Sequence, residues 1–198
     1  MALQTISSKT HVVLTNRQRS IGILRMAFGV AWVFAAYLKW QPAFLSGFAD
    51  TVKGAMEGQP QFVQVWIGFW LNIIHLNPTF FAVLEATAET LLAVCFLLGL
   101  YTDVACVLGI LLSLGIWSVG EGFGGPYVAG QSTDVGAAFP YIILCALFFC
   151  VRAGSYYSLD NVLASRLKRL PASEKAGETE VEEKVPSLVG ERKMNARR

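Results

Sequence analysis

Four long apolar stretches follow one another along this chain of 198 residues. They cover residues 20–40, 78–98, 104–119 and 135–151. A helix rises about 1.5 Å per residue, so about 20 apolar residues cross the roughly 30 Å hydrocarbon layer of a bilayer. The pattern therefore predicts an all-α, polytopic membrane protein whose main domain, residues 20–152, is a four-helix transmembrane bundle.

Proline, glycine and capping residues mark the expected ends of these helices. Pro78 opens the second stretch, because the first turn of a helix tolerates a residue without an N–H. Gly99 closes it, so the second and third stretches are predicted to form a helical hairpin. Ser132, Thr133 and Asp134 precede the fourth stretch and are good N-cap residues. We therefore expect the fourth helix to begin directly after them.

The segment between the first two predicted spans has an intermediate character. Its second half, residues 61–76, places several large apolar side chains on one helical stripe: Phe62, Trp66, Phe69, Trp70 and Ile73. This run is short for a span and rich in aromatic residues, which favours an interfacial or re-entrant helical segment on the outer face. A fifth span is the alternative.

Charged residues make up 15% of the chain, against about 25% in a typical soluble domain. No lysine or arginine lies between Lys53 and Arg152. Each one costs about 2.5–3.5 kcal/mol at the centre of a membrane, which explains their absence from a chain that crosses a lipid bilayer. The basic residues gather at the two ends, a pattern that does not indicate nucleic-acid binding.

The same basic residues predict the orientation, because lysine and arginine favour the cytoplasmic side. The N-terminal segment, residues 1–19, is polar and basic, and Arg152 begins a basic carboxyl end. The loop after the first span contains only Lys53, and the loop after the third contains no basic residue. Both termini are therefore predicted to lie in the cytoplasm, with the protein integral to the plasma membrane.

Two further segments follow the bundle. Apolar residues recur at helical spacing in residues 153–170, opposite basic ones, which predicts an amphipathic helix on the anionic cytoplasmic leaflet. Residues 171–198 carry dense mixed charge and no aromatic residue, which predicts a disordered cytoplasmic tail.

Ionisable residues within spans are expensive and are therefore candidates for function. Arg25, Glu85 and Glu89 are the candidate catalytic residues, and the two glutamates lie one helical turn apart on the same face. If the first two spans pack antiparallel, Arg25 and Glu89 differ in depth by about two turns' rise at most, a gap that a reaching arginine could narrow. Lys39 and Glu85 are similarly offset towards the outer side. Two interpretations remain open: a polar network that fixes helix packing, or a site that handles protons or a quinone.

A second group of polar residues is expected near the outer ends of the spans. It comprises Lys39, His75, Glu121, Tyr127 and Asp134, which we take as candidate substrate-binding residues. Beside the neighbouring tryptophans they would suit a polar head group that enters with a lipidic tail. Each also has a simpler interpretation: His75 as an interfacial residue, Tyr127 as part of an aromatic belt and Asp134 as a helix cap.

Metal and haem chemistry have weak support. The four cysteines are Cys95, Cys106, Cys145 and Cys150. None forms a CxxC pair, and cysteine packs readily as a small hydrophobe. Three of them would share a depth at which a soft metal could bind, but their spacing matches no known motif. A haem needs axial ligands, and both histidines lie outside the spans. No bound metal or haem is predicted.

Two sequence patterns resemble those of a known family. The first span reads Arg25-x3-Gly29-x2-Trp32-x6-Lys39-Trp40-x-Pro42. The third ends in EGFGGPY at residues 121–127, followed by Thr133-Asp134-x-Gly136, and this second pattern is the more specific. Together they resemble the DoxD branch of the DoxX-like membrane proteins, over about residues 18–165.

DoxD is a membrane subunit of thiosulfate:quinone oxidoreductase. The resemblance implies a four-helix membrane bundle, oxidation of thiosulfate to tetrathionate, a quinone as electron acceptor and a second oxidoreductase subunit as partner. Two other functions stay open: a non-catalytic scaffold that anchors redox or stress-response partners, and a small proton-coupled transporter formed by a homo-oligomer.

Overall fold

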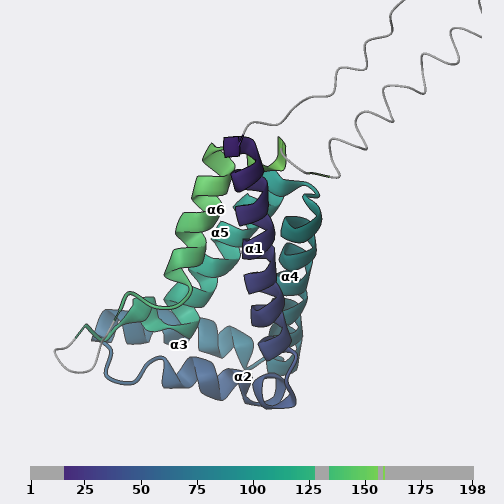
Figure 1. The fold of residues 1–198 in the computed structure, drawn as a ribbon. Helices are drawn as coiled ribbons and strands as arrows, with labels where there is room; N and C mark the ends of the chain where they lie inside the picture. The colour runs from purple at the N-terminus through teal and green to yellow at the C-terminus, as the bar shows by residue number, and fades with distance from the viewer. Residues whose placement is uncertain (1–15, 128–133, 156–157, 159–198) are drawn as a thin grey trace, which may run out of the picture. The chain divides into compact units, whose positions relative to one another are not determined.

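The computed structural model describes residues 16–127, 134–155 and 158. The chain divides into two compact units, Met1–Ser158 and Leu159–Arg198, and every described residue belongs to the first. This described part is helical and contains no strand (Figure 1). The amphipathic helix predicted for residues 153–170 lies almost wholly outside the described residues, and the predicted tail lies entirely outside them.

Among the described residues, three helices are long and apolar enough to cross a membrane. They are α1 (Asn16–Lys39), α4 (Pro78–Leu98), and α5 (Thr102–Gly115) together with the π-helix η1 (Ile116–Gly120) that continues it. Helix α4 has the bounds expected from its proline and glycine: the Asn77 side chain caps its start, and Gly99 ends it in the left-handed conformation. Helix α1 packs antiparallel along α4, and α5 packs along α6 (Phe139–Cys150).

Helix α6 is shorter than the fourth span expected from the sequence. It has 12 residues and so rises only about 18 Å. Its N-cap is Ala138, and the prediction that Asp134 caps this helix is wrong. The Asp134 carboxylate instead accepts a hydrogen bond from the Gly136 N–H at 2.7 Å, in a local turn. Gly136 has a φ of 95°, which a helix cannot include, so the helix starts after it.

Two further helices lie across the end of α1 and α4 (Figure 1). These are α2 (Pro42–Gly54) and α3 (Gln61–Ile74). Helix α3 has 14 residues and corresponds to the predicted interfacial segment, whereas α2 was not predicted as a helix. Pro42 occupies the first turn of α2, where a backbone N–H would have no partner within the helix, so its absence costs no hydrogen bond.

The buried side chains form two apolar clusters. The first joins α1, α4, α5 and α6 through Phe28, Trp32, Leu92, Phe96, Cys106, Cys145 and Phe148. The second joins α2, α3 and the start of α4 through Phe48, Val52, Val63, Ile67, Leu71, Ile74 and Ala82. Cys106 and Cys145 are fully buried and pack as small apolar side chains.

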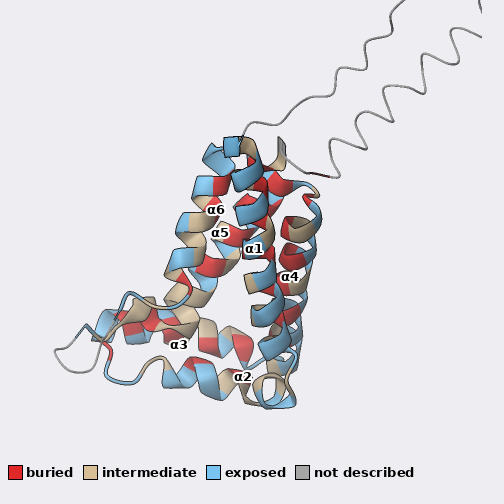
Figure 2. Cartoon of the chain, in the orientation of Figure 1, coloured by how far each residue is buried: buried red, intermediate tan, exposed pale blue. Residues whose placement is uncertain are grey.

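The outer sides of the helices are also apolar. Figure 2 shows buried residues gathered where helices face one another, with exposed residues on the outer sides. Large apolar side chains are among those exposed, for example Phe34, Leu91, Leu111 and Leu147. Soluble monomers rarely expose contiguous apolar surface of this kind, so these helix faces are compatible with a lipid bilayer.

Candidate functional site

A cavity of about 490 Å³ lies at the junction of α2, α3, α4 and α5. Most of its lining is apolar and aromatic: Phe44, Phe48, Val52, Trp70, Ile74, Phe81, Leu84, Leu111, Leu112, Ile116 and Val119. The charged side chains in the lining are Lys39, Glu85 and Glu121. We call this space the large cavity. Its volume lies within the range of about 300–1,000 Å³ that is usual for ligand sites.

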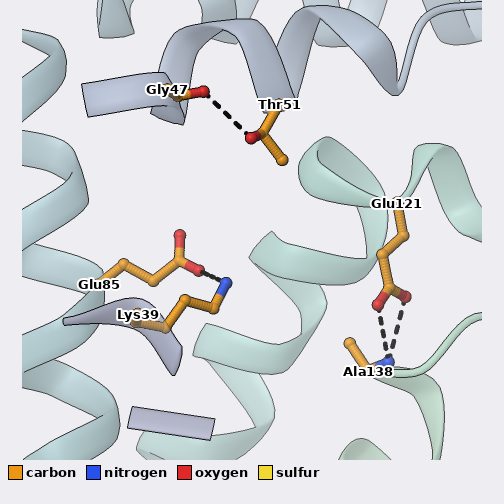
Figure 3. A network of polar contacts seen from close by, with 6 residues as sticks. All are labelled: Lys39, Gly47, Thr51, Glu85, Glu121 and Ala138. Carbon is orange, nitrogen blue, oxygen red and sulfur yellow. Dashed lines mark hydrogen bonds and ion pairs between the residues drawn. The ribbon is translucent and has the colours of Figure 1, made fainter. Parts of the chain in front are cut away.

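Lys39 and Glu85 form an ion pair in the wall of the large cavity (Figure 3). Lys39 ends α1, where a cation is favoured by the partial negative charge of the helix end. Its Nζ also lies 4.4 Å from the centre of the Phe44 ring. The two charged side chains are only 22% and 15% exposed, so water screens their attraction weakly. The structure thus brings together two residues that the sequence placed near the outer side of two spans but offset in depth.

Glu89 lies one helical turn beyond Glu85 and is 2% exposed. It interacts electrostatically with Lys39 and Glu85, but its Oε2 accepts no hydrogen bond from any described residue. The indole Nε1 of Trp32, a residue 1% exposed, likewise finds no acceptor in the part of the chain that the structure describes. Buried polar atoms without partners are costly and uncommon, and they often mark a functional site or a bound water molecule.

Tyr141 of α6 packs beside Trp32. Its ring centre lies 5.0 Å from that of Trp32, in an edge-to-face arrangement, and it interacts electrostatically with Glu89. Neither aromatic residue was a candidate from the sequence, because an aromatic side chain in an apolar run gives no sign that its polar atom is unpaired. The interior beside the large cavity therefore combines an unpaired donor with an unpaired acceptor.

Arg25 is fully buried but lies at a different level from Glu89. Its Nε donates a hydrogen bond to the Phe96 carbonyl and its Nη1 to the Ala153 carbonyl, each at 3.1 Å. Phe96 follows Glu89 by seven residues, which is about 10 Å along the helix. Arg25 therefore binds the carboxyl end of α4, where backbone carbonyls attract a cation. The expected approach of Arg25 to Glu89 is not found.

Glu121 faces the large cavity from the side opposite the ion pair (Figure 3). Both of its carboxylate oxygens accept a hydrogen bond from the Ala138 N–H at 3.1 Å, which holds the start of α6. The π-helix η1, just before Glu121, supplies Ile116, Val119 and Gly120 to the same wall. Short π-helical turns are rare and are frequently found at functional sites.

The five candidate substrate-binding residues do not form one cluster. Lys39 and Glu121 share the large cavity, whereas Tyr127 lines a second cavity and donates its hydroxyl to the Phe123 carbonyl. His75 is exposed at the end of α3, and Asp134 lies in the turn before α6. Neither of these two residues lines either of the two cavities described.

The charges of the large cavity indicate what it can hold. Its described lining combines one cation, Lys39, with two carboxylates, Glu85 and Glu121. An anion would meet a net negative charge there, so the lining favours a neutral amphipathic ligand. Within residues 16–127, 134–155 and 158, no group of three or more His, Cys, Asp or Glu side chains is placed to hold a metal ion.

Comparisons of the chain with protein-family models, with curated proteins and with solved structures find no match. The chemistry of the large cavity must therefore be inferred from its own shape, lining and charge.

Proposed function

We propose that this chain is a membrane subunit of a quinone-linked oxidoreductase, and that its large cavity binds the quinone head group. One observation carries this proposal: a cavity of about 490 Å³ with apolar walls has a nearly buried Lys39–Glu85 ion pair in its lining, beside helices long enough to span a bilayer. A quinone is neutral, lipid-soluble and rich in carbonyl oxygens. The apolar walls suit its ring, and the Lys39 ammonium group can donate a hydrogen bond to a ring carbonyl.

In the proposed membrane arrangement, α1, α4, α5 with η1, and α6 form a four-span bundle in the plasma membrane. Helix α6 is short, so we infer that the bilayer thins locally around it or that residues 134–138 extend its path. Helices α2 and α3 lie at the outer interface, and both termini are cytoplasmic. The scarcity of basic residues between Lys53 and Arg152 supports this orientation.

Reduction of a quinone takes up two electrons and two protons and yields a quinol. Glu85 lines the cavity and Glu89 lies one turn further into α4, so these two carboxyl groups are placed to pass protons towards a bound quinone. Chains of carboxyl groups within spans are a known means of proton transfer. Trp32 and Tyr141 would complete the polar surroundings of Glu89.

The likeness to DoxD proteins supports thiosulfate as the electron donor. Oxidation of two thiosulfate ions to one tetrathionate releases the two electrons that the quinone accepts. Thiosulfate is a dianion, and the two carboxylates of the large cavity would repel it. We therefore assign thiosulfate oxidation to a partner subunit and quinone binding to this chain.

The proposal is tested in membranes from cells whose natural copy has been replaced by the wild-type chain or by a variant, so that any partner subunit is present. The measurement is thiosulfate-dependent quinone reduction, followed by quinone absorbance. We expect Lys39→Met to reduce the rate at least tenfold. Lys53→Met removes an exposed lysine outside the cavity and is expected to leave the rate unchanged. Equal rates of quinone reduction in these two variants would show that the large cavity is not the quinone site.

A further inference from the structure

A second cavity, of about 290 Å³, lies between the start of α3 and the glycine-rich turn that follows η1. It is lined by Gly58, Gln59, Pro60, Phe62, Val63, Gly122, Phe123, Pro126 and Tyr127. We call it the small cavity. Glu121 and Gly122 are adjacent in the chain, yet the first lines the large cavity and the second lines the small one. The two spaces therefore border the same turn.

Gln59 is the polar side chain that distinguishes the small cavity. The residue is only 7% exposed, and its backbone carbonyl is fixed by a hydrogen bond from Gln64 Nε2 at 2.7 Å. Its side-chain amide makes no hydrogen bond with any described residue, although it can donate two and accept two. The residue is nearly buried and lines the cavity, so the contents of the cavity are the main source of partners for this amide. The amide therefore points to a ligand in the cavity that it lines.

The glycine-rich turn is shaped around this amide. A β-carbon at Gly125 would lie 2.7 Å from Gln59 Oε1, and one at Gly122 would collide with Nε2. Gly122 also has a φ of 54°, a conformation that other residues adopt reluctantly. The two glycines thus leave the amide room to face the cavity. The hydrogen bond from the Tyr127 hydroxyl to the Phe123 carbonyl holds the opposite wall.

The lining also limits the charge and size of a ligand. Among the described residues, none of the nine that line this cavity carries a charge, so an ion would lose its hydration without gaining a partner from them. Phe62, Phe123 and Tyr127 present ring faces or edges to a flat apolar molecule. A volume of about 290 Å³ is at the lower end of the usual range for ligand sites and suits one ring rather than a ring with a long tail.

We propose that the small cavity is a separate binding site for a neutral ring compound with a carbonyl group, which accepts a hydrogen bond from the Gln59 amide. The site does not depend on the proposed role of the large cavity. The ligand can come from solution or from the membrane, since a tail-less ring compound and the head group of a lipid-borne one share this chemistry.

The test is equilibrium dialysis with the full chain in nanodiscs and three probes: a tail-less dimethoxy-methyl-benzoquinone, its decyl derivative, and benzoate as a ring of similar size with a negative charge. We expect both benzoquinones to bind and benzoate not to bind. Similar affinity for the two benzoquinones would identify the ring alone as the ligand, and much tighter binding of the decyl form would identify a lipid-borne source.

The variants separate the two cavities. Because a quinone can also bind in the large cavity, each titration is done in the Lys39→Met background. There, Gln59→Leu should weaken benzoquinone binding at least tenfold by removing the amide at similar size. Phe62→Ala removes a ring from the wall at a residue that is 74% exposed, so folding should be preserved while affinity falls several-fold. Unchanged affinity in both variants, or equal binding of benzoate, would overturn the proposal.

Discussion

Arg25 and Gly99 fit together only because Gly99 has no side chain: a β-carbon there would lie 2.6 Å from Arg25 Nη1. Gly99 ends α4 with a φ of 66°, so its conformation also favours glycine. The arginine reaches across from α1 and donates to the carbonyl of Phe96 in the last turn of α4. One buried cation thus ties the amino-terminal half of α1 to the carboxyl end of α4.

Gly99→Ala should therefore destabilise the fold. The left-handed conformation alone costs about 1 kcal/mol for a residue other than glycine, and displacement of the guanidinium adds to this, so we expect a loss of about 1–3 kcal/mol. Thermal unfolding in detergent, followed by circular dichroism, measures the change. Gly47→Ala in α2 is the matched control, because no atom lies within 4 Å of its added β-carbon. A similar fall in both variants would contradict this account.

The Lys39–Glu85 pair should show thermodynamic coupling. Lys39→Met leaves the Glu85 carboxylate without its cation, and Glu85→Gln leaves Lys39 without its carboxylate. Each change should cost on the order of 1–3 kcal/mol. The double variant should cost less than the sum, since neither charge is then left unpaired. Strict additivity in a double-mutant cycle of unfolding free energies would show that the ion pair makes no contribution.

Glu89 should behave differently from Glu85, although the two lie one turn apart. Glu89→Gln replaces a buried carboxyl group whose Oε2 has no partner, so stability should change by less than about 1 kcal/mol. Quinone reduction that needs Glu89 to pass protons should nevertheless fall. Stability and rate are measured on the same preparations. A stability loss as large as that of Glu85→Gln would show that Glu89 holds the fold together.

Glu121→Ala should loosen the start of α6. Both carboxylate oxygens accept a hydrogen bond from Ala138 N–H, and the loss of a helix cap typically costs about 1 kcal/mol. Hydrogen exchange should become faster at the Ala138 amide and in the first turn of α6. Asp134→Ala is the control, because Asp134 accepts only from Gly136 N–H and does not contact the helix. Faster hydrogen exchange in α6 of the Asp134→Ala variant would show that Asp134, and not Glu121 alone, stabilises the start of this helix.

The proposed topology places Asn16 and His75 on opposite sides of the membrane. Both residues are exposed, so a single cysteine at either position should be open to a reagent. In a background without the four native cysteines, a membrane-impermeant maleimide added to intact spheroplasts should label the cysteine at position 75. The cysteine at position 16 should react only after the membrane is opened. Labelling from the same side would refute the orientation.

The sequence predicted α4 closely because its signals are local. A long apolar run lies between Pro78 and Gly99, and these two residues act on the backbone next to them. The start of α6 could not be predicted in this way. Its first amide is held by Glu121, 17 residues earlier in the chain, and the nearer Asp134 bonds within its own turn. Helix α2 had a usable signal in the spacing of Phe44, Phe48 and Val52, which its glycines and polar residues obscured.

The candidate site was predictable in its charges and not in its partners. The sequence placed Lys39 and Glu85 on two neighbouring spans towards the same side, but offset in depth, and their direct ion pair is a finding of the structure. The partners of Arg25 depend on where α4 ends and on Ala153, which approaches from a distant part of the sequence. Whether Trp32 Nε1 and Glu89 Oε2 find hydrogen-bond partners depends on which polar groups of other helices lie near them in the folded chain, and the sequence does not show this.

Glu121 serves two neighbours with one carboxylate: it lines the large cavity, and it holds the first N–H of α6. A molecule in the cavity that drew this carboxylate away would leave the Ala138 N–H without its acceptor. The stability of the amino end of α6 would then report whether the cavity is full or empty. A change in the occupancy of the large cavity would in this way alter the stability of α6, although no described residue of α6 lines the cavity.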